Sequence, residues 1–178
     1  SLISTSTNMI REYAPIALIP AAWAMTFAIM IYPGLDVYWI QHMHYFMILF
    51  LTGFTVLSWK QMRENTVLDV WRKVIAAGII FTGLGALSFT VNSYSQILAF
   101  SSLTYWFLAP GIALYYSSER MEEYSDLYQK LGGESVIGLG LFILGLYTEV
   151  ISLQIIGIIG IAVVQTWSIV VASKLDSE

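Results

Sequence analysis

The sequence predicts an all-α, polytopic membrane protein with six transmembrane helices. Three observations favour this class. The residues are 57% hydrophobic and only 11% charged, the apolar residues fall into six stretches, and the Lys and Arg residues occupy alternate polar breaks between them. A soluble domain usually carries about 25% charged residues, so this chain has too little charge for a water-facing surface. We therefore expect one domain, residues 1–178, folded as a six-span bundle.

The first three spans are expected at residues 14–32, 40–59 and 74–90. Each is close to the roughly 20 residues that a helix needs to cross a hydrocarbon core about 30 Å thick. The Pro-Gly pair at 33–34 ends the first span, because proline cannot continue a helix. The charged segment 60–73 (KQMRENTVLDVWRK) separates the second span from the third and is expected to form helix extensions or a short interfacial helix.

The last three spans are expected at residues 96–116, 135–149 and 153–172. The Pro-Gly pair at 110–111 predicts a kink in the fourth span. The Leu-Gly-Gly at 131–133 predicts a helix end before the fifth span begins. These assignments pair the six spans into three helical hairpins with tight turns.

The Lys and Arg residues predict the orientation of these hairpins. Cationic loops are retained on the cytoplasmic side of a membrane. The breaks after the first, third and fifth spans carry no Lys or Arg. We therefore expect a prokaryotic cytoplasmic membrane, both termini cytoplasmic, and three hairpins closed on the outer side. The cationic residues are Arg11, Lys60, Arg63, Arg72, Lys73, Arg120, Lys130 and Lys174.

Several functional classes are disfavoured by the composition. A net charge of −4 argues against nucleic acid, which needs a basic patch. The chain has no cysteine, so thiolate ligands and cysteine nucleophiles are excluded. No hydrolase or phosphate-loop motif is present, and no Asp, Glu, Lys or Arg lies in the middle of a span, which argues against an ion-coupled pump. Membrane lipid is an expected partner and bound ligand, together with other integral membrane subunits.

His42 and His44 are the candidate metal ligands, with Glu149 as a further one. They are the only histidines, and they open the second span from the outer side. On a regular helix, residues two apart point about 200° away from each other, so one ion would need an extended segment. Imidazole and thioether groups both suit copper, and a single histidine could also ligate haem beside a methionine or a partner subunit. Alternatively, the histidines are hydrogen-bonded interfacial residues or contact a quinone or another substrate.

Asn92, Gln96 and Gln165 are the candidate ligand-binding residues. Asn92 and Gln96 lie in the outer turn between spans three and four, on the same side as Glu149. Gln165 is a polar insertion in span six, where an amide usually hydrogen-bonds a neighbouring helix. Four tryptophans lie near predicted span ends and are expected to act as interfacial anchors, with ligand stacking as the alternative: Trp39, Trp59, Trp71 and Trp106.

The segment 41–53 (QHMHYFMILFLTG) carries a resemblance. A histidine-bearing stretch that opens an apolar span in a six-helix chain of this length resembles an uncharacterised archaeal family of small integral membrane proteins. It is also distantly similar to CtaG-like membrane proteins linked to haem–copper oxidase assembly. The resemblance implies a role in copper handling or beside a respiratory oxidase, with His42 and His44 as the residues carried over.

The sequence leaves three functions open. The leading expectation is a non-catalytic subunit or assembly component of a larger redox or respiratory membrane complex, because the chain has tight turns, glycine-bearing helix faces and no catalytic set. The second is an outward-facing copper- or haem-binding protein that uses His42 and His44. The third is a small-molecule transporter with a site near Gln165 and the proline in span four.

Overall fold

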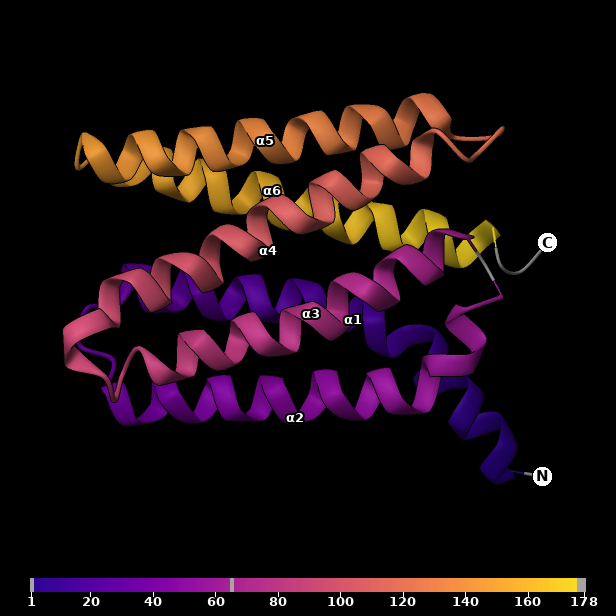
Figure 1. Ribbon diagram of the computed structural model, residues 1–178, viewed down its shortest axis with the longest axis horizontal. Coiled ribbons are helices and arrows are strands. Elements are labelled where there is room, and N and C mark those ends of the chain that lie inside the picture. Colours follow the sequence, from indigo (N-terminus) through magenta and orange to yellow (C-terminus); the bar gives the residue numbers. More distant parts are fainter. Residues whose placement is uncertain (1, 65, 176–178) are drawn as a thin grey trace.

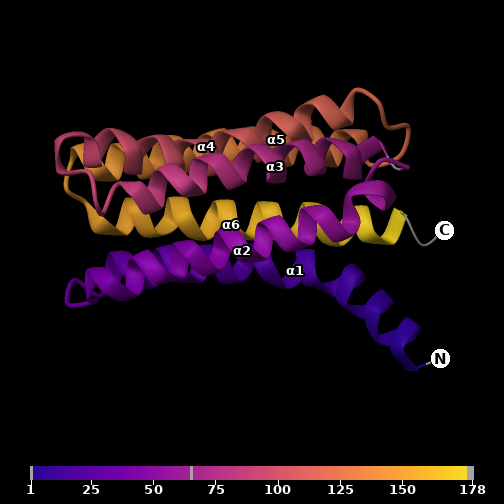
Figure 2. The same ribbon diagram turned by 60° about the horizontal axis from the view of Figure 1, so that its bottom comes forward.

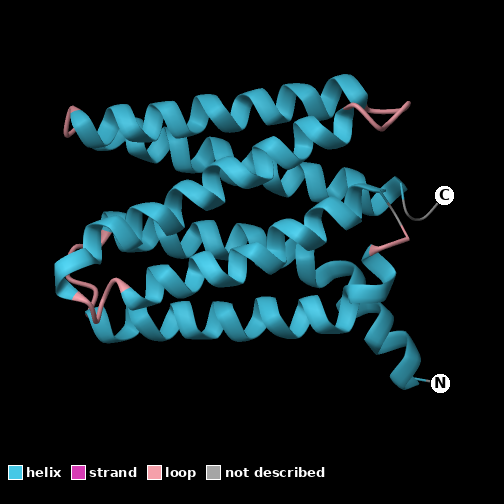
Figure 3. Cartoon of the chain, in the orientation of Figure 1, coloured by secondary structure: helices cyan, strands magenta, loops and turns pink. Residues whose placement is uncertain are grey.

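The structure, a computed structural model, describes the backbone of residues 2–64 and 66–175 and the side chains of residues 17–64, 66–172 and 174. This part of the chain is almost entirely helical and contains no strand (Figure 3). The predicted all-α class is therefore confirmed. The elements are α1 (Leu2–Ile31), α2 (Val37–Met62), α3 (Thr66–Leu87), the 3-10 helix η1 (Asn92–Tyr94), α4 (Ser95–Ser118), α5 (Ser125–Tyr147) and α6 (Ile151–Leu175).

The helices have the length and composition of membrane spans. Five of them, α2 to α6, are long and apolar enough to cross a membrane. In α1 the stretch with described side chains, Ala17–Ile31, is apolar but shorter. Many large apolar side chains on the outside of the bundle are exposed, as expected where lipid replaces water. The chain is thus a multi-pass helical membrane protein.

The packing order of the helices follows the chain. α2 packs on α3, α3 on α4, α4 on α5 and α5 on α6. α1 lies between α6 and α2 but contacts α2 far less than α6. Successive helices run in opposite directions, so α1 begins and α6 ends at the same end of the bundle (Figure 1). The N-terminal part of α1 bends away from the other helices (Figure 2).

The two ends of the bundle differ in charge. We call the end where α2, α4 and α6 finish the charged end, and the end with the turns at 32–36, 88–94 and 148–150 the turn end. All Lys and Arg residues with described side chains lie at the charged end: Lys60, Arg63, Arg72, Lys73, Arg120, Lys130 and Lys174. Arg11 belongs to the part of α1 whose side chains the structure does not describe.

One cluster at the charged end links α2 to α3. Arg72 Nη2 lies 2.6 Å from Asp69 Oδ1, and Lys73 Nζ lies 2.8 Å from Asp69 Oδ2. The Arg72 guanidinium carbon lies 4.2 Å from the ring centroid of Trp59 on α2. Since α2 ends at Met62 and α3 begins at Thr66, the segment 60–73 consists mostly of the ends of these two helices.

Glycines bring α4, α5 and α6 into backbone contact. A Cβ on Gly132 would lie 2.9 Å from the carbonyl oxygen of Gly111, and a Cβ on Gly157 would lie 2.6 Å from that of Gly138. These distances leave no room for a side chain, so the helix backbones approach closely, as small residues allow in membrane bundles.

Three helices begin well before the expected spans. α1 begins at Leu2 rather than near 14. α3 begins at Thr66 rather than near 74, and α5 begins at Ser125 rather than near 135. The predicted helix end at 131–133 is wrong, because these residues lie inside α5. Gly132 serves the contact with α4 and not a chain reversal. The break before α5 comes instead at Tyr124, which adopts a left-handed φ of 61°. α4 continues as a helix through Pro110, and the kink expected there stays a prediction.

Candidate functional site

A cavity of about 270 Å³, partly open to the outside, lies between the helices of the bundle. An apolar cavity of about 150 Å³ is enough to hold benzene, so this one has room for a ring and several further carbon atoms. Its walls come from α1, α2, α3, α4, α6 and residues 88–89, whereas α5 contributes none of the lining residues. The cavity therefore lies on the side of the bundle where α1 faces α2 and α3.

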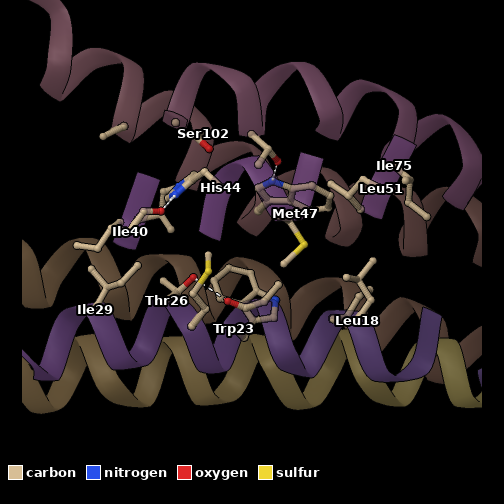
Figure 4. A pocket seen from close by; sticks show the side chains of 18 of the residues that line it. Leu18, Trp23, Thr26, Ile29, Ile40, His44, Met47, Leu51, Ile75 and Ser102 are labelled. Carbon is tan, nitrogen blue, oxygen red and sulfur yellow. Dashed lines mark hydrogen bonds between the residues drawn. The ribbon is translucent and has the colours of Figure 1, made fainter. Parts of the chain in front are cut away.

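The cavity has a polar end and an apolar end. Figure 4 shows His44 and Ser102 near Ile40 and Ile29 at one end, and Leu18, Leu51 and Ile75 at the other, with Trp23 and Met47 between them. The polar end lies toward the turn end of the bundle, because His44 is two turns into α2 and Ser88 follows the last turn of α3. Apolar side chains line most of the rest, with the polar Thr26, Thr82 and Gln165 among them. Such a site matches the general form of small-molecule sites, which combine apolar walls with a few fixed polar groups.

The helix that carries His44 has a well-defined start. Asp36 caps α2: its Oδ1 accepts a hydrogen bond from the Tyr38 backbone N–H over 2.9 Å. His44 is half-buried, and its Nδ1 lies 2.8 Å from the carbonyl oxygen of Ile40 one turn earlier. Its ring also makes an edge contact with Phe89, with the centroids 5.3 Å apart. These contacts hold the imidazole in one orientation at the cavity wall.

The side chains of His44 and Ser102 meet beside Gly85. A Cβ on Gly85 would lie 2.8 Å from Ser102 Oγ and 3.2 Å from His44 Cδ2, the ring atom bonded to Nε2. Within the described part of the chain, neither Ser102 Oγ nor His44 Nε2 makes a hydrogen bond, and neither atom is fully enclosed by protein. The polar end thus presents two hydrogen-bonding atoms to the cavity, close to each other.

A chain of hydrogen bonds fixes the middle of the cavity wall. Trp23 Nε1–H donates to Gln165 Oε1 over 2.9 Å, and Gln165 Nε2–H donates to the Trp106 carbonyl oxygen over 2.8 Å. Trp106 Nε1–H donates to Thr82 Oγ1 over 3.1 Å, and the Thr82 hydroxyl donates to the Gly78 carbonyl oxygen over 2.8 Å. These bonds connect α1, α6, α4 and α3. Both ends of the Gln165 amide are occupied, so Gln165 shapes the wall as interhelical glue.

The structure separates His42 from His44. α2 is a regular helix over both residues, so the extended segment that a shared ion would need is not present. His42 is exposed, its Nδ1 lies 2.7 Å from the Tyr38 carbonyl oxygen, and its ring packs on that of Tyr38. Among the described residues, no group of three or more His, Asp or Glu side chains could hold a metal ion. A site that joins the two histidines is therefore not supported.

The other predicted site residues also differ in whether they face the cavity. Asn92 in η1, Gln96 at the start of α4 and Glu149 in the turn before α6 are all exposed, and none of them lines the cavity. Glu149 adopts a left-handed φ of 57° there. Only His44 and Gln165 of the candidate residues face the cavity.

Sequence reasoning missed Ser102 and Trp23 and misplaced two tryptophans. Ser102 and Trp23 sit in apolar stretches, where nothing in one sequence distinguishes a residue that faces a cavity from one that faces lipid. Trp71 is 2% exposed in the core, and Trp106 is half-buried in the cavity wall. α3 begins before the expected span, so Trp71 lies within the packed bundle, and α4 turns Trp106 toward the cavity. The interpretation of these two tryptophans as interfacial anchors is therefore wrong.

No protein-family model, curated protein or solved structure matches this chain. The resemblance of segment 41–53 to archaeal and CtaG-like membrane proteins therefore stays a prediction. The function must be inferred from the cavity itself.

Proposed function

We propose that this protein binds a small, mainly apolar molecule inside the membrane, in the cavity lined by α1, α2, α3, α4 and α6. The observation that carries the proposal is the combination of an apolar cavity of about 270 Å³ with two free polar atoms at one end. An empty cavity in a membrane bundle is unfavourable, because the side chains that line it lose van der Waals contacts. Occupation by a lipid-soluble molecule restores those contacts.

We also propose that all six helices span a prokaryotic cytoplasmic membrane, with both termini and the charged end in the cytoplasm. The support is the position of the described Lys and Arg residues, which gather at the charged end and are absent from the turn end. The three hairpins then close on the outer side. In this orientation the polar end of the cavity lies in the outer half of the membrane.

The proposed entrance for the ligand is the boundary between α1 and α2, which we call the seam. Among the residues that the structure describes, α1 is held mainly by α6 and contacts α2 little, so separating α1 from α2 there breaks fewer contacts than separating any of the pairs α3–α4, α4–α5 and α5–α6. Cavity-lining residues come from both sides of this seam, including Met25 and Ile29 on α1 and Ile40 and Met47 on α2. A ligand would enter sideways from the lipid.

Competitive photolabelling tests the proposal. Purified protein in phosphatidylcholine vesicles is exposed to three diazirine probes, derived from decane, decyl methyl ether and decanol. We expect at least one probe to label Met47 and Leu51, which are buried in the cavity wall, in a manner that excess unlabelled compound suppresses. Labelling of lipid-facing residues is not saturable, so competition separates the two. Mass spectrometry of the peptides locates the label.

Two variants of α1 provide a matched comparison. Ala22 lines the cavity, whereas Ala24 on the same helix is exposed and does not. Ala22→Phe should fill the cavity and lower saturable labelling about tenfold, and Ala24→Phe should leave it unchanged. The proposal fails if no probe gives saturable labelling at Met47 and Leu51, or if the two variants behave alike.

A copper site is a second candidate, favoured by one observation. His44 shares the cavity wall with Met47, one turn further on α2, and with Met25 on α1. Imidazole and two thioethers form a ligand set that suits Cu(I). Metal analysis of the purified protein, followed by His44→Phe and Met47→Leu, tests it. Stoichiometric copper that both variants lose and His42→Phe keeps would support this candidate, and a metal-free native protein would remove it.

The role of a subunit or assembly component in a redox or respiratory complex stays a prediction from the sequence. The exposed apolar faces of the helices fit lipid and a partner subunit equally. Purification from native membranes under mild detergent tests this role. Co-migrating membrane subunits in fixed stoichiometry are the expected result, and a monodisperse single chain would contradict it.

A further inference from the structure

We infer that the ligand of the cavity is an amphiphile with a free hydroxyl group, and that this group binds between His44 Nε2 and Ser102 Oγ. The inference rests on the proposed function and names the chemical class of the ligand. Its basis is the hydrogen-bonding state of the two atoms at the polar end, together with the shape of the cavity beyond them.

His44 offers an acceptor to the cavity. Its Nδ1 lies 2.8 Å from the Ile40 carbonyl oxygen, and a carbonyl oxygen can only accept, so Nδ1 carries the proton and donates it. In a neutral imidazole the other ring nitrogen is then an acceptor. The surrounding wall is mostly apolar, and no Asp or Glu is among the described residues that line the cavity, so nothing there would balance a positive charge on the ring.

Ser102 offers both a donor and an acceptor. Its hydroxyl is turned toward Gly85, next to the His44 ring, and it makes no hydrogen bond within the described residues. A serine hydroxyl rotates to suit its partner. One oxygen atom of a ligand could therefore accept from Ser102 Oγ–H and donate its own proton to His44 Nε2.

A hydroxyl group satisfies this pair better than a ketone, ester, ether, carboxylate or ammonium group does. A ketone, ester or ether oxygen only accepts, so it would leave His44 Nε2 without a donor. A carboxylate would place a negative charge against a neutral acceptor, and an ammonium group would bury a positive charge without a counterion. A hydroxyl donates and accepts at once and carries no charge.

The rest of the cavity sets the form of the ligand. From the polar end the walls run past Trp23 and Met47 to Leu18, Leu51 and Ile75, all apolar at the far end (Figure 4). A volume of about 270 Å³ holds one ring with a short chain or one alkyl chain, but not a whole phospholipid. A long-chain alcohol and an alkylphenol both present a hydroxyl ahead of an apolar body, so the test includes one of each.

The three decyl probes and a diazirine derivative of pentylphenol test the inference in phosphatidylcholine vesicles. Unlabelled compounds compete for labelling of Met47 and Leu51. We expect decanol or pentylphenol to compete about tenfold more strongly than decyl methyl ether, the ratio that one hydrogen bond gives. The stronger of the two hydroxyl compounds identifies an aliphatic or a phenolic source.

Variants at the polar end complete the test. His44→Phe keeps an aromatic ring and removes the acceptor, and His42→Phe on the exposed face is its matched control. We expect the preference for hydroxyl over ether to disappear in His44→Phe, to fall several-fold in Ser102→Ala and to persist in His42→Phe. Ser102→Ala carries the test if His44→Phe does not fold.

The outcomes separate this inference from the function on which it rests. Equal saturable competition by alcohol and ether overturns the hydroxyl inference and leaves the binding function standing. A hydroxyl preference that survives both His44→Phe and Ser102→Ala also overturns it. The absence of saturable labelling by every probe overturns both proposals.

Discussion

The α4–α5–α6 side of the bundle and the α1–α2 side are packed by different means. On the first, glycines at 111, 132, 138 and 157 let helix backbones touch. On the second, α1 and α2 make few contacts, and large side chains such as Trp23 and Met47 surround open volume. In lipid there is little hydrophobic drive for helices to associate, so close backbone packing supplies the stability. The looser side is free to hold a ligand.

The largest effect is expected where the tight side is broken. A Cβ on Gly157 would lie 2.6 Å from the Gly138 carbonyl oxygen and 2.9 Å from the Phe142 backbone nitrogen, and backbone atoms cannot turn aside. Gly157→Ala should cost about 3 kcal/mol of unfolding free energy. Gly160 on the same helix has open space at its Cβ, so Gly160→Ala should be neutral or slightly stabilising. Thermal unfolding in detergent measures both, and equal melting temperatures would contradict the contrast.

A smaller effect is expected where the two sides are joined. Gln165→Leu removes the partners of the Trp23 indole N–H and the Trp106 carbonyl, leaving both groups unpaired in a buried site. The expected cost is about 2 kcal/mol. Gln154→Leu removes one half-buried hydrogen bond, to the Gly145 carbonyl oxygen, and should cost about 0.5 kcal/mol. Urea unfolding monitored by tryptophan fluorescence compares them. A larger loss in Gln154→Leu would show that the Gln165 network does not hold the halves together.

On the cavity side, Gly78 tests how much the wall can yield. A Cβ there would lie 2.5 Å from Cη2 and Cζ2 of Trp106, but the obstacle is a side chain, which can move toward the open cavity. Gly78→Ala should therefore cost only about 1 kcal/mol while reducing ligand binding. Gly83, with nothing near its Cβ, provides the control. A loss as large as that of Gly157→Ala would mean that the cavity side is as rigid as the other.

The smallest effect is expected at the charged end. Trp59→Leu removes the ring that packs on the Arg72 guanidinium. The Trp59 ring is exposed, and a cation–π contact at the surface contributes about 0.5–1 kcal/mol. The ion pairs of Asp69 with Arg72 and Lys73 remain. Thermal unfolding should show a small decrease and ligand binding should not change. Loss of binding in this variant would show that the α2–α3 contact at the charged end also positions the cavity.

Much of the fold could be predicted, because membrane spans are long apolar stretches and turns are marked by proline and glycine. The predicted helix end at 131–133 failed for a physical reason. Glycine both ends helices and allows two helices to touch, and one sequence does not say which. Gly132 takes the second role, against Gly111.

The site could be predicted only in part. His44 was singled out as one of the only two histidines of the sequence, and Gln165 as a polar residue in an apolar span, where such residues are rare and costly. Their roles depend on facing directions, which differ even between His44 and its near neighbour His42. Ser102 and Gly85 gave no signal, because their meeting with His44 is a contact among three helices.

The sparse contact between α1 and α2 has a consequence for how binding should be measured. A ligand that enters by this seam is taken from the bilayer, so occupancy follows its mole fraction among the lipids and not its concentration in water. A binding curve plotted against aqueous concentration would shift whenever the amount of lipid changes, whereas one plotted against mole fraction would not. Two hydroxyl compounds that differ only in partition coefficient would then give the same curve.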